Sequence, residues 1–511
     1  MKPRHRILHI PTFWAEYYRY WDNPESATAG LRLKVLLVVG IGSSLYNHGD
    51  ANAPRRNTDM VHQWIYAAQT WLTGPLEKDR LDITGLQIYC LTLLARQIFS
   101  IGGDTVWISM GSLIHKAMQI GLHRDPKHLP PMSVLQAEIR RRLWATVLDL
   151  AVQASLDSSM PPRISLDEFD TEPPSNINDD ELDSSTTLLN PPLRTALTST
   201  SSQLALLDSL PVRLRIVNLL NNLHSPPSYP AVLALTRELT PFLRNSPPTN
   251  NPFHHSLLDH LTRRFLLPLH ASFAHRALAD PEFTYSLNLS LDTALAILLP
   301  NGKNTATSGS YCPEFSHLLT STPAAASAGG MFGETVRCVT TAVSLALLAH
   351  AGMQRTSGTL FAVRPTASDA RGDGEMEEDD GGGTVRGLLK RKVRSLMESA
   401  EERVKNGAET NVKGAMFLGM VLAQVGAVEK GLDEMGVGRE VARAAGERLG
   451  VCERLLRGRV EEVVATVGEE FGGDGRGVDV AGGGMEGVMG DGSWGSEMGD
   501  WGSLFFEDAG F

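Results

Sequence analysis

The sequence predicts an all-α fold followed by a C-terminal tail of different character. Long segments carry apolar residues at helical spacing, whereas no series of segments alternates polar and apolar residues as strands do. Hydrophobic residues make up 42% of the 511 residues and charged residues 21%, as in globular proteins, which excludes a fibrous or wholly disordered chain. Of the 48 glycines, 31 lie in residues 371–511, where the character of the sequence changes.

Three helices are predicted between residues 86 and 156. Residues 86–101 are apolar nearly all round, as expected of a central helix. Asp104 is a suitable N-cap for the second helix, which Gly121 would end. Ser133 and Gln136 form a capping-box pattern that opens the third helix. On this third helix the expected inward positions are Leu135, Ile139, Leu143, Val147 and Leu150, and the residues expected largely on the other face are Glu138, Arg140 and Arg141.

The remaining segments are predicted to complete a helical body with connections and a tail. Further helices are expected over residues 256–278, 291–299 and 335–353, and exposed connections over residues 184–202 and 225–252. We expect four parts in all: a helical regulatory domain, an acidic glycine-rich linker, a C-terminal helical segment and a disordered tail. These four parts cover residues 1–363, 364–383, 384–470 and 471–511.

Charge and cysteine content exclude several classes of protein. The formal net charge is −11, and the chain has no cluster of Lys and Arg of the kind that neutralises DNA phosphates. The four cysteines lie far apart without a C-x-x-C pair, so we expect neither a disulfide framework nor a cysteine zinc site. Pro11 and Glu16 interrupt the N-terminal segment, which is not expected to be a signal peptide. Residues 338–354 are predicted to form a buried helix, and no membrane span is expected.

One short motif suggests a protein kinase. His123, Arg124 and Asp125 spell the catalytic triplet, but the leucine and asparagine that should follow it are replaced, and the glycine-rich loop is missing. The plainer interpretation is a turn at the end of a helix, in which Arg124 and Asp125 form local hydrogen bonds. We expect this turn and no catalytic residue here.

A second motif suggests a different enzyme. Asp179, Asp180 and Asp183 match the D-D-x-x-D pattern with which all-α terpene synthases hold Mg²⁺. The motif follows a segment of loop composition instead of ending an apolar helix, which favours a solvated acidic turn. An all-α enzyme of the terpene-synthase type remains the alternative function.

Two further patterns have ordinary structural interpretations. Gly40 and Gly42 resemble part of a dinucleotide fingerprint, but the third glycine is absent, so we expect helix-packing glycines. His254, His255 and His260 lack the spacing of a metal site, and we expect exposed loop histidines. No metal-binding or cofactor-binding residue is therefore predicted in this chain.

The C-terminal tail interleaves large apolar residues with acidic residues and glycines. Its candidate activation residues are Trp494, Trp501, Leu504, Phe505 and Phe506. Charges keep such side chains solvated and free to dock into a partner, which is typical of activation segments. The alternative is that the aromatic residues fold back onto the helical body as a strap.

Three ordered motifs resemble a known family. The first motif ends one predicted helix, the second lies within the next helix, and the third runs along an extended segment. Their residues are Gly121, Leu122, His123, Arg124 and Asp125; Arg140, Arg141, Arg142, Leu143 and Trp144; and Pro162, Ile164, Asp170, Pro173 and Asn176. Together they resemble the middle homology region of the fungal-specific transcription factors that carry a binuclear zinc cluster. The resemblance covers residues 7–182 closely.

The resemblance implies an all-α regulatory domain in a nuclear regulator of transcription by RNA polymerase II, acting on target genes such as a biosynthetic gene cluster. Implied partners are the transcription machinery or a coactivator, DNA and a second copy in a homodimer. In the family, six cysteines in an N-terminal module hold two zinc ions and contact DNA. We expect no cofactor in this chain, zinc only through that missing module, and DNA contact through the module or a partner protein. Within the domain we expect Trp144 to be buried and Arg124 to be held by carboxylates or helix-end carbonyls.

Overall fold

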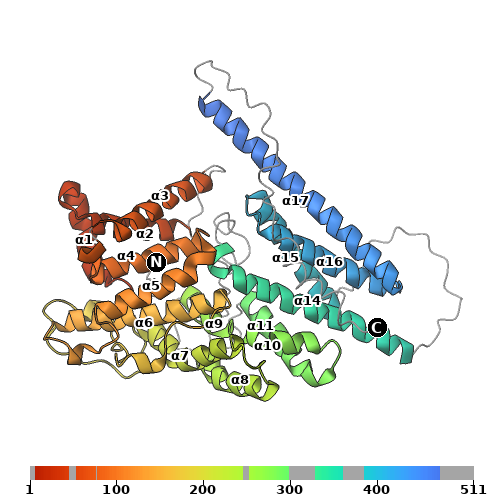
Figure 1. Ribbon diagram of the computed structural model, residues 1–511, viewed down its shortest axis with the longest axis horizontal. Helices are drawn as coiled ribbons and strands as arrows, with labels where there is room; N and C mark the ends of the chain where they lie inside the picture. The colour runs from red at the N-terminus through yellow and green to blue at the C-terminus, as the bar shows by residue number, and fades with distance from the viewer. Residues whose placement is uncertain are drawn as a thin grey trace.

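The computed structural model describes residues 6–44, 53–75, 77–245, 252–298, 329–360 and 385–471. All regular structure in these ranges is helical, which confirms the predicted all-α class (Figure 1). The α-helices are α1 (Ile10–Asp22), α2 (Ala29–Ser43), α3 (Ala53–Thr73), α4 (Ile83–Ile98), α5 (Val106–Gln119), α6 (Val134–Asp157), α7 (Ser201–Leu220), α8 (Tyr229–Arg244), α9 (Pro252–Arg263), α10 (Leu266–Arg276), α11 (Thr284–Leu298), α14 (Gly329–Leu360), α15 (Val385–Lys405), α16 (Asn411–Glu429) and α17 (Glu434–Phe471). Short 3₁₀ turns lie at Pro24–Ser26, Glu77–Arg80, Gly103–Thr105, Pro126–His128, Leu166–Glu168, Asp179–Glu181 and Pro281–Phe283.

The sequence correctly predicted the residues that begin α6, but it did not predict the N-cap of α5. The predicted capping box is present, because the Ser133 hydroxyl accepts from the Gln136 amide while the Gln136 side chain accepts from the Ser133 amide. For α5 the expected N-cap was wrong. Residues 103–105 form a 3₁₀ turn before the α-helix, so the N-cap is Thr105 and not Asp104.

The first apolar core forms around α4, the helix whose sequence is apolar nearly all round. Helices α2, α3, α5 and α6 pack against it, and α14 reaches it from the C-terminal half. Polar side chains on α4 are buried as well, among them Gln87 and Thr92. This confirms the predicted central helix. In Figure 1 the helices α1 to α6 form the red and orange half of the molecule.

A second apolar core joins α9, α10 and α11 to α14, α15 and α16. Helix α17 packs along α15 and α16 and extends beyond them (Figure 1). By length and composition α14 and α16 are apolar enough to cross a membrane, but 56% of the apolar stretch Phe332–Gly352 of α14 is buried inside the protein. This degree of burial is typical of a core helix, which agrees with the buried helix predicted over residues 338–354.

Two segments differ from the expected secondary structure. The proline-rich residues 225–252, predicted to be an exposed connection, contain α8. Pro230 lies in the first turn of α8, where its missing amide hydrogen breaks no helical bond, and Val232 and Leu239 supply a buried face. Residues 256–278, predicted as one helix, are divided at Arg264 between α9 and α10.

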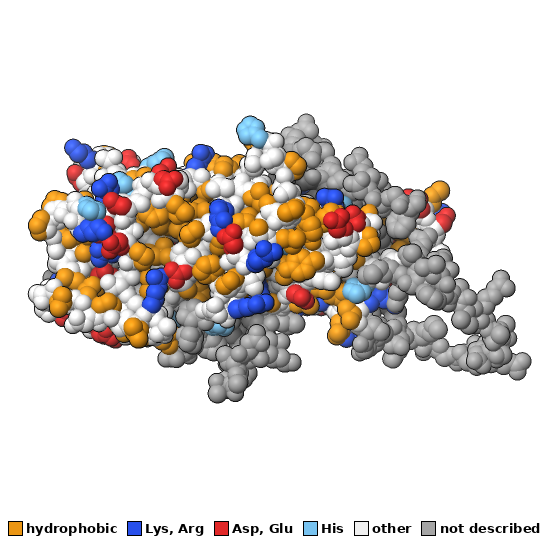
Figure 2. Space-filling view, turned by 90° about the horizontal axis from the view of Figure 1, so that it is seen from below, with side chains coloured by type: hydrophobic (Ala, Val, Ile, Leu, Met, Phe, Trp, Pro, Cys, Tyr) orange, Lys and Arg blue, Asp and Glu red, His pale blue; other side chains and the backbone are white. Residues whose placement is uncertain are grey.

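The molecular surface carries charges of both signs. On the face shown in Figure 2, Lys and Arg side chains are scattered among acidic side chains and hydrophobic ones, and they do not gather into a basic patch. Several surface cations are paired with carboxylates, including Arg215 with Glu238 and Arg194 with Asp208. This face therefore offers little concentrated positive charge to a polyanion.

Candidate functional site

The first family motif forms the turn that ends α5. Gly121 adopts a φ of +77°, and the Leu122 amide donates to the Ala117 carbonyl at 2.9 Å, which closes the helix as predicted. Arg140 crosses over this turn from α6 and donates to the Ile120 carbonyl at 2.5 Å. A Cβ atom at Gly121 would lie 3.3 Å from the Arg140 guanidinium. Glycine thus serves both the backbone conformation and the close approach.

Asp125 joins this turn to the second motif on α6. Its carboxylate is fully buried and accepts two hydrogen bonds from Arg141, from Nε and Nη2, each at 2.9 Å. The amides of Lys127 and Glu172 donate to the same carboxylate at 3.0 Å. The expectation of local hydrogen bonds was thus only partly right. Lys127 is local, whereas Arg141 and Glu172 come from α6 and from the extended third motif.

These contacts change the acidity of the Asp125 carboxyl group. Burial alone raises the pKa of a carboxyl group, because the charged form loses water. The hydrogen bonds from Arg141 and from the two backbone amides outweigh burial here, and the pKa of Asp125 falls from 3.8 to about 2. Asp125 is therefore a charged anchor at neutral pH and not a proton donor.

Arg124 is held by a carboxylate, as predicted. Its Nη2 atom lies 3.2 Å from Oδ2 of Asp170, which belongs to the third motif. The Asp170 amide also donates to the His123 carbonyl at 3.0 Å, and the Asp125 amide donates to Asp170 Oδ1 at 2.8 Å. The Arg124 side chain is 53% exposed, so the ion pair itself adds little stability and the backbone bonds fix the segment.

Glu138 was expected on the outer face of its helix, and this was wrong. The side chain is fully buried, and its oxygens accept from the Ser175 amide and hydroxyl at 3.0 Å and from Arg141 Nη1 at 3.1 Å. The reason is tertiary: the extended third motif lies over the face of α6 that helical periodicity assigns to solvent. Glu138 consequently binds the second motif to the third.

Asp179 was expected in a solvated acidic turn and is instead 5% exposed. Its Oδ1 atom accepts from Arg142 at 2.8 Å, and its Oδ2 atom accepts from Arg6 at 3.1 Å. Asp180 and Asp183, the other two carboxylates of the D-D-x-x-D pattern, are exposed. The three carboxylates do not converge, and Asp179 is already neutralised by two guanidinium groups. This arrangement contradicts the magnesium-site interpretation.

Trp144 is buried, as predicted, with 1% of its surface exposed. The ring of Phe169 meets it edge-on, with 5.6 Å between ring centroids, and Leu143 and Ile164 are buried in the same apolar core. Asn176 is also buried, and it donates to the carbonyls of Leu193 and Ala196. Two motif prolines line the outer side of the third motif: Pro162 is half-buried and Pro173 is exposed.

Several buried charges were not predicted. Arg6 belongs to the Asp179 cluster, and Arg213 of α7 donates to Asp149 of α6 at 2.7 Å, with both side chains buried. The sequence held one usable signal for this second pair: Asp149 interrupts an otherwise apolar stretch of α6, and an isolated charge in a buried helix requires a partner. Its partner lies 64 residues away and gives no local signal.

Other residues singled out from sequence have structural roles. His254, His255 and His260 lie on α9 and not in a loop; His255 is exposed, whereas His260 is 1% exposed and packs edge-on against Phe332. The expectation of a loop was therefore wrong for all three histidines, and the expectation of exposure was wrong for His260. Gly40 is a packing glycine, as expected, because a Cβ there would lie 3.1 Å from Val61. The same expectation was wrong for Gly42, because a Cβ there would meet nothing within 4 Å.

The described residues contain no group of three or more His, Cys, Asp or Glu side chains that could hold a metal ion. In and beside the three motifs, the carboxylates of Asp125, Glu138 and Asp179 are buried and bonded to arginines or backbone amides. We call this set, with Arg141, Arg142 and Arg6, the charge clasp. The clasp fixes the third motif against α6 and presents no open reactive group.

The predicted activation residues lie outside the described residues. They are Trp494, Trp501, Leu504, Phe505 and Phe506. The expected linker over residues 364–383 lies outside them as well.

Comparison with known proteins finds the family that the three motifs resemble. Residues 2–225 match the family model described as the fungal specific transcription factor domain. The chain is 46% identical over 492 residues to the transcription factor asR3 of Sarocladium schorii, an alignment that covers 89% of this chain and 55% of the relative.

Two other relatives extend the comparison. The aspyridones cluster regulator apdR of Emericella nidulans is 35% identical over 317 residues, covering 57% of this chain and 42% of the relative. The Zn(2)-C6 fungal-type transcription factor pigI of Monascus ruber is 26% identical over 313 residues, covering 57% and 38%. The chain spans about half the length of curated relatives such as asR3. The same alignments cover about 90% of this chain. No solved structure matches it.

The matched domain and the relatives belong to transcription factors, which are not enzymes, and this agrees with the D-D-x-x-D carboxylates failing to converge. The domain match contains all three motifs and the whole charge clasp, since the clasp runs from Arg6 to Asp179. Over residues 2–225, the chain carries a fungal specific transcription factor domain.

Proposed function

We propose that this protein is a nuclear regulator of transcription by RNA polymerase II that controls a biosynthetic gene cluster. The observation that carries the proposal is the 46% identity to a transcription factor along 89% of the chain. The proposal of a cluster target draws on the relative named as the aspyridones cluster regulator. The charge clasp supports a rigid regulatory domain, since its buried ion pairs tie together segments far apart in the sequence.

DNA contact is proposed to come from a zinc-cluster module joined to this domain or from a partner protein. One relative is named as a Zn(2)-C6 type. The described residues offer no metal site, and the face in Figure 2 offers no basic patch. Zinc would act there by shaping the DNA-reading module.

The tail is proposed to carry transcriptional activation. Trp501, Phe505 and Phe506 lie among acidic residues and glycines, and aromatic residues in such a segment can dock into a groove on a coactivator. Fusing residues 473–511 to an unrelated DNA-binding domain should activate a reporter gene. Replacing the three aromatic residues together by alanine should abolish activation.

The matched control neutralises charge and keeps the aromatic residues. Changing Asp500, Glu507 and Asp508 to their amides should reduce reporter activity less than the aromatic change does, because burial of rings supplies most of the affinity. If the aromatic variant activates as well as the parent tail, the tail is a strap or a spacer.

The regulatory role itself is tested in the fungus that carries the gene. Deleting the gene should change transcript levels of a contiguous set of biosynthetic genes, and restoring it should reverse the change. A tagged protein should accumulate in the nucleus and be recovered with promoter DNA of those genes by chromatin immunoprecipitation. Unchanged transcripts together with a protein outside the nucleus would contradict the proposal.

A further inference from the structure

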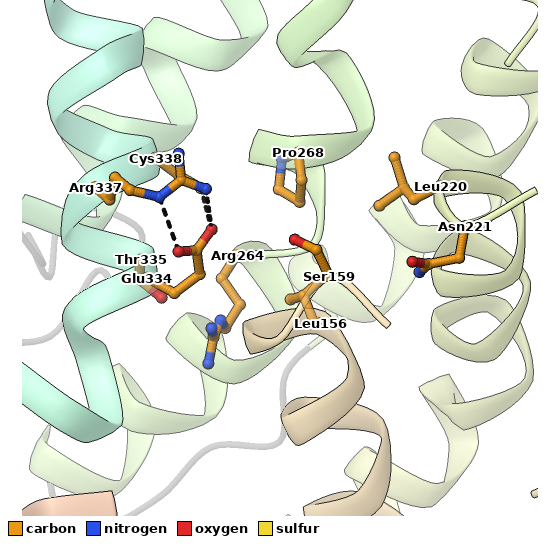
Figure 3. Close-up of a pocket in the computed structure, with 10 residues that line it drawn as sticks. All are labelled: Leu156, Ser159, Leu220, Asn221, Arg264, Pro268, Glu334, Thr335, Arg337 and Cys338. Atoms are coloured by element: carbon orange, nitrogen blue, oxygen red, sulfur yellow. Dashed lines mark hydrogen bonds and ion pairs between the residues drawn. The ribbon is translucent and has the colours of Figure 1, made fainter. Parts of the chain in front are cut away.

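A cavity of about 190 Å³ lies where the two apolar cores meet. Figure 3 shows its wall, which comes from four helices and the link between α9 and α10. Leu156 lies in the last turn of α6, and Leu220 ends α7. Pro268 belongs to α10, and Thr335 and Cys338 belong to α14. The cavity therefore touches both the domain with the charge clasp and the helix that leads to the C-terminal helices.

Two buried polar groups in the wall have hydrogen-bonding capacity that the protein does not use. Arg264 is 3% exposed and Thr335 is 2% exposed. Arg264 Nη2 is bonded to Asp157, but its Nε atom has no protein partner, and neither does the Thr335 hydroxyl. Unsatisfied buried polar groups are rare, because each costs about 1–3 kcal/mol. Both residues line the cavity.

The charge around Arg264 favours an anion as the ligand. Burial lowers the pKa of Arg264 to about 10 in spite of the acidic groups near it, and a further anion at this guanidinium group would stabilise its charged form. Glu334 also lines the cavity, but its two oxygens are turned towards Arg337, which donates to them from Nε at 2.9 Å and from Nη2 at 2.5 Å (Figure 3).

The rest of the wall favours an apolar body on the ligand. Leu156, Leu220 and Pro268 supply aliphatic surface opposite α14. Cys338 is a neutral thiol, since burial, helped by Glu334, raises its pKa to about 12. A dry cavity of about 150 Å³ accommodates benzene, so the present volume suits one ring with a small substituent.

We propose that this cavity binds a small carboxylate with an aromatic or branched apolar body, of about the size of benzoate. The carboxylate lies against Arg264 Nε and the Thr335 hydroxyl, and the apolar body lies among Leu156, Leu220 and Pro268. The bound molecule bridges α6 and α7 to α14. This binding does not depend on the proposed function in transcription.

The test uses the full 511-residue chain and benzoate as the probe, with binding followed by saturation-transfer NMR and by titration calorimetry. We expect benzoate to bind with a dissociation constant on the order of 1 mM or tighter, as its small size allows. Benzamide, which has the same shape without the charge, and acetate, which lacks the ring, should each bind at least about fivefold more weakly.

Three variants test whether benzoate binds in this cavity. Thr335→Val should weaken benzoate binding about tenfold, the effect of one lost hydrogen bond of about 1.4 kcal/mol. Thr341→Val, on the same helix but outside the cavity, should leave binding unchanged. Cys338→Phe should fill the cavity and abolish binding. Arg264 is left intact, because it also anchors Asp157 and its loss would disturb folding.

Three results would overturn the proposal. The first is no binding of benzoate at about ten times the expected dissociation constant. The second is equal binding of benzoate and benzamide, which would show that charge plays no part. The third is benzoate binding that survives both Thr335→Val and Cys338→Phe, which would place the probe elsewhere on the protein.

Discussion

Asp125→Asn removes one negative charge from the centre of the charge clasp and keeps the shape of the side chain. Four hydrogen bonds end on the Asp125 carboxylate, two from Arg141 and one each from the amides of Lys127 and Glu172. In the variant an NH₂ group replaces one acceptor oxygen, so at least one of these buried donors loses its partner. Arg141 keeps Glu138 as an acidic neighbour.

The expected loss of stability follows from two contributions. The pKa of Asp125 falls from 3.8 to about 2 on folding, which corresponds to about 2 kcal/mol of stability at neutral pH. A buried donor left without a partner adds about 1–3 kcal/mol. Asp125→Asn should therefore lower the free energy of unfolding by about 3–5 kcal/mol, the range observed when one partner of a buried ion pair is removed.

The pH dependence gives a second readout of the same contact. Because folding lowers the pKa of Asp125, its charge stabilises the native state fully above the unfolded value near 4. That contribution is lost as the pH falls towards 2. Urea denaturation should thus show a constant difference between parent and variant from about pH 7 to about pH 5, and a smaller difference below about pH 4.

The matched control is Asp180→Asn, which removes an exposed carboxylate from the 3₁₀ turn Asp179–Glu181. Its effect should stay within about 0.5 kcal/mol. If Asp125→Asn and Asp180→Asn unfold at the same urea concentration, the charge clasp does not stabilise the domain and the reasoning is wrong.

Three further predictions concern the buried cluster and DNA. Asp179→Asn should destabilise the domain by about 3–5 kcal/mol, since Arg6 and Arg142 lose their buried counter-charge; an unchanged thermal midpoint would contradict this. Trp144→Ala should cost about 3–5 kcal/mol in calorimetry, whereas Trp21→Ala, on an exposed ring, should cost less than about 1 kcal/mol; equal losses would refute the core assignment. The purified chain alone should bind duplex DNA only weakly in fluorescence anisotropy, and tight sequence-selective binding without zinc or partner would refute this.

The sequence alone determined what depends on neighbours along the chain. The capping box at Ser133 and the glycine that ends α5 were readable, because their hydrogen bonds join residues three to five positions apart. Burial of Trp144 followed from the apolar stripe beside it, and the central position of α4 followed from its apolar surface. The three motifs together identified the family.

Tertiary structure alone decided the partners of the buried charges. Periodicity assigned Glu138 to solvent and loop composition did the same for Asp179, yet the extended third motif and the N-terminal Arg6 cover them. These contacts join residues 37 to 173 positions apart. A charged side chain has the same local pattern whether it faces water or a distant guanidinium group, since the free energy that distinguishes the two arises only when the segments meet.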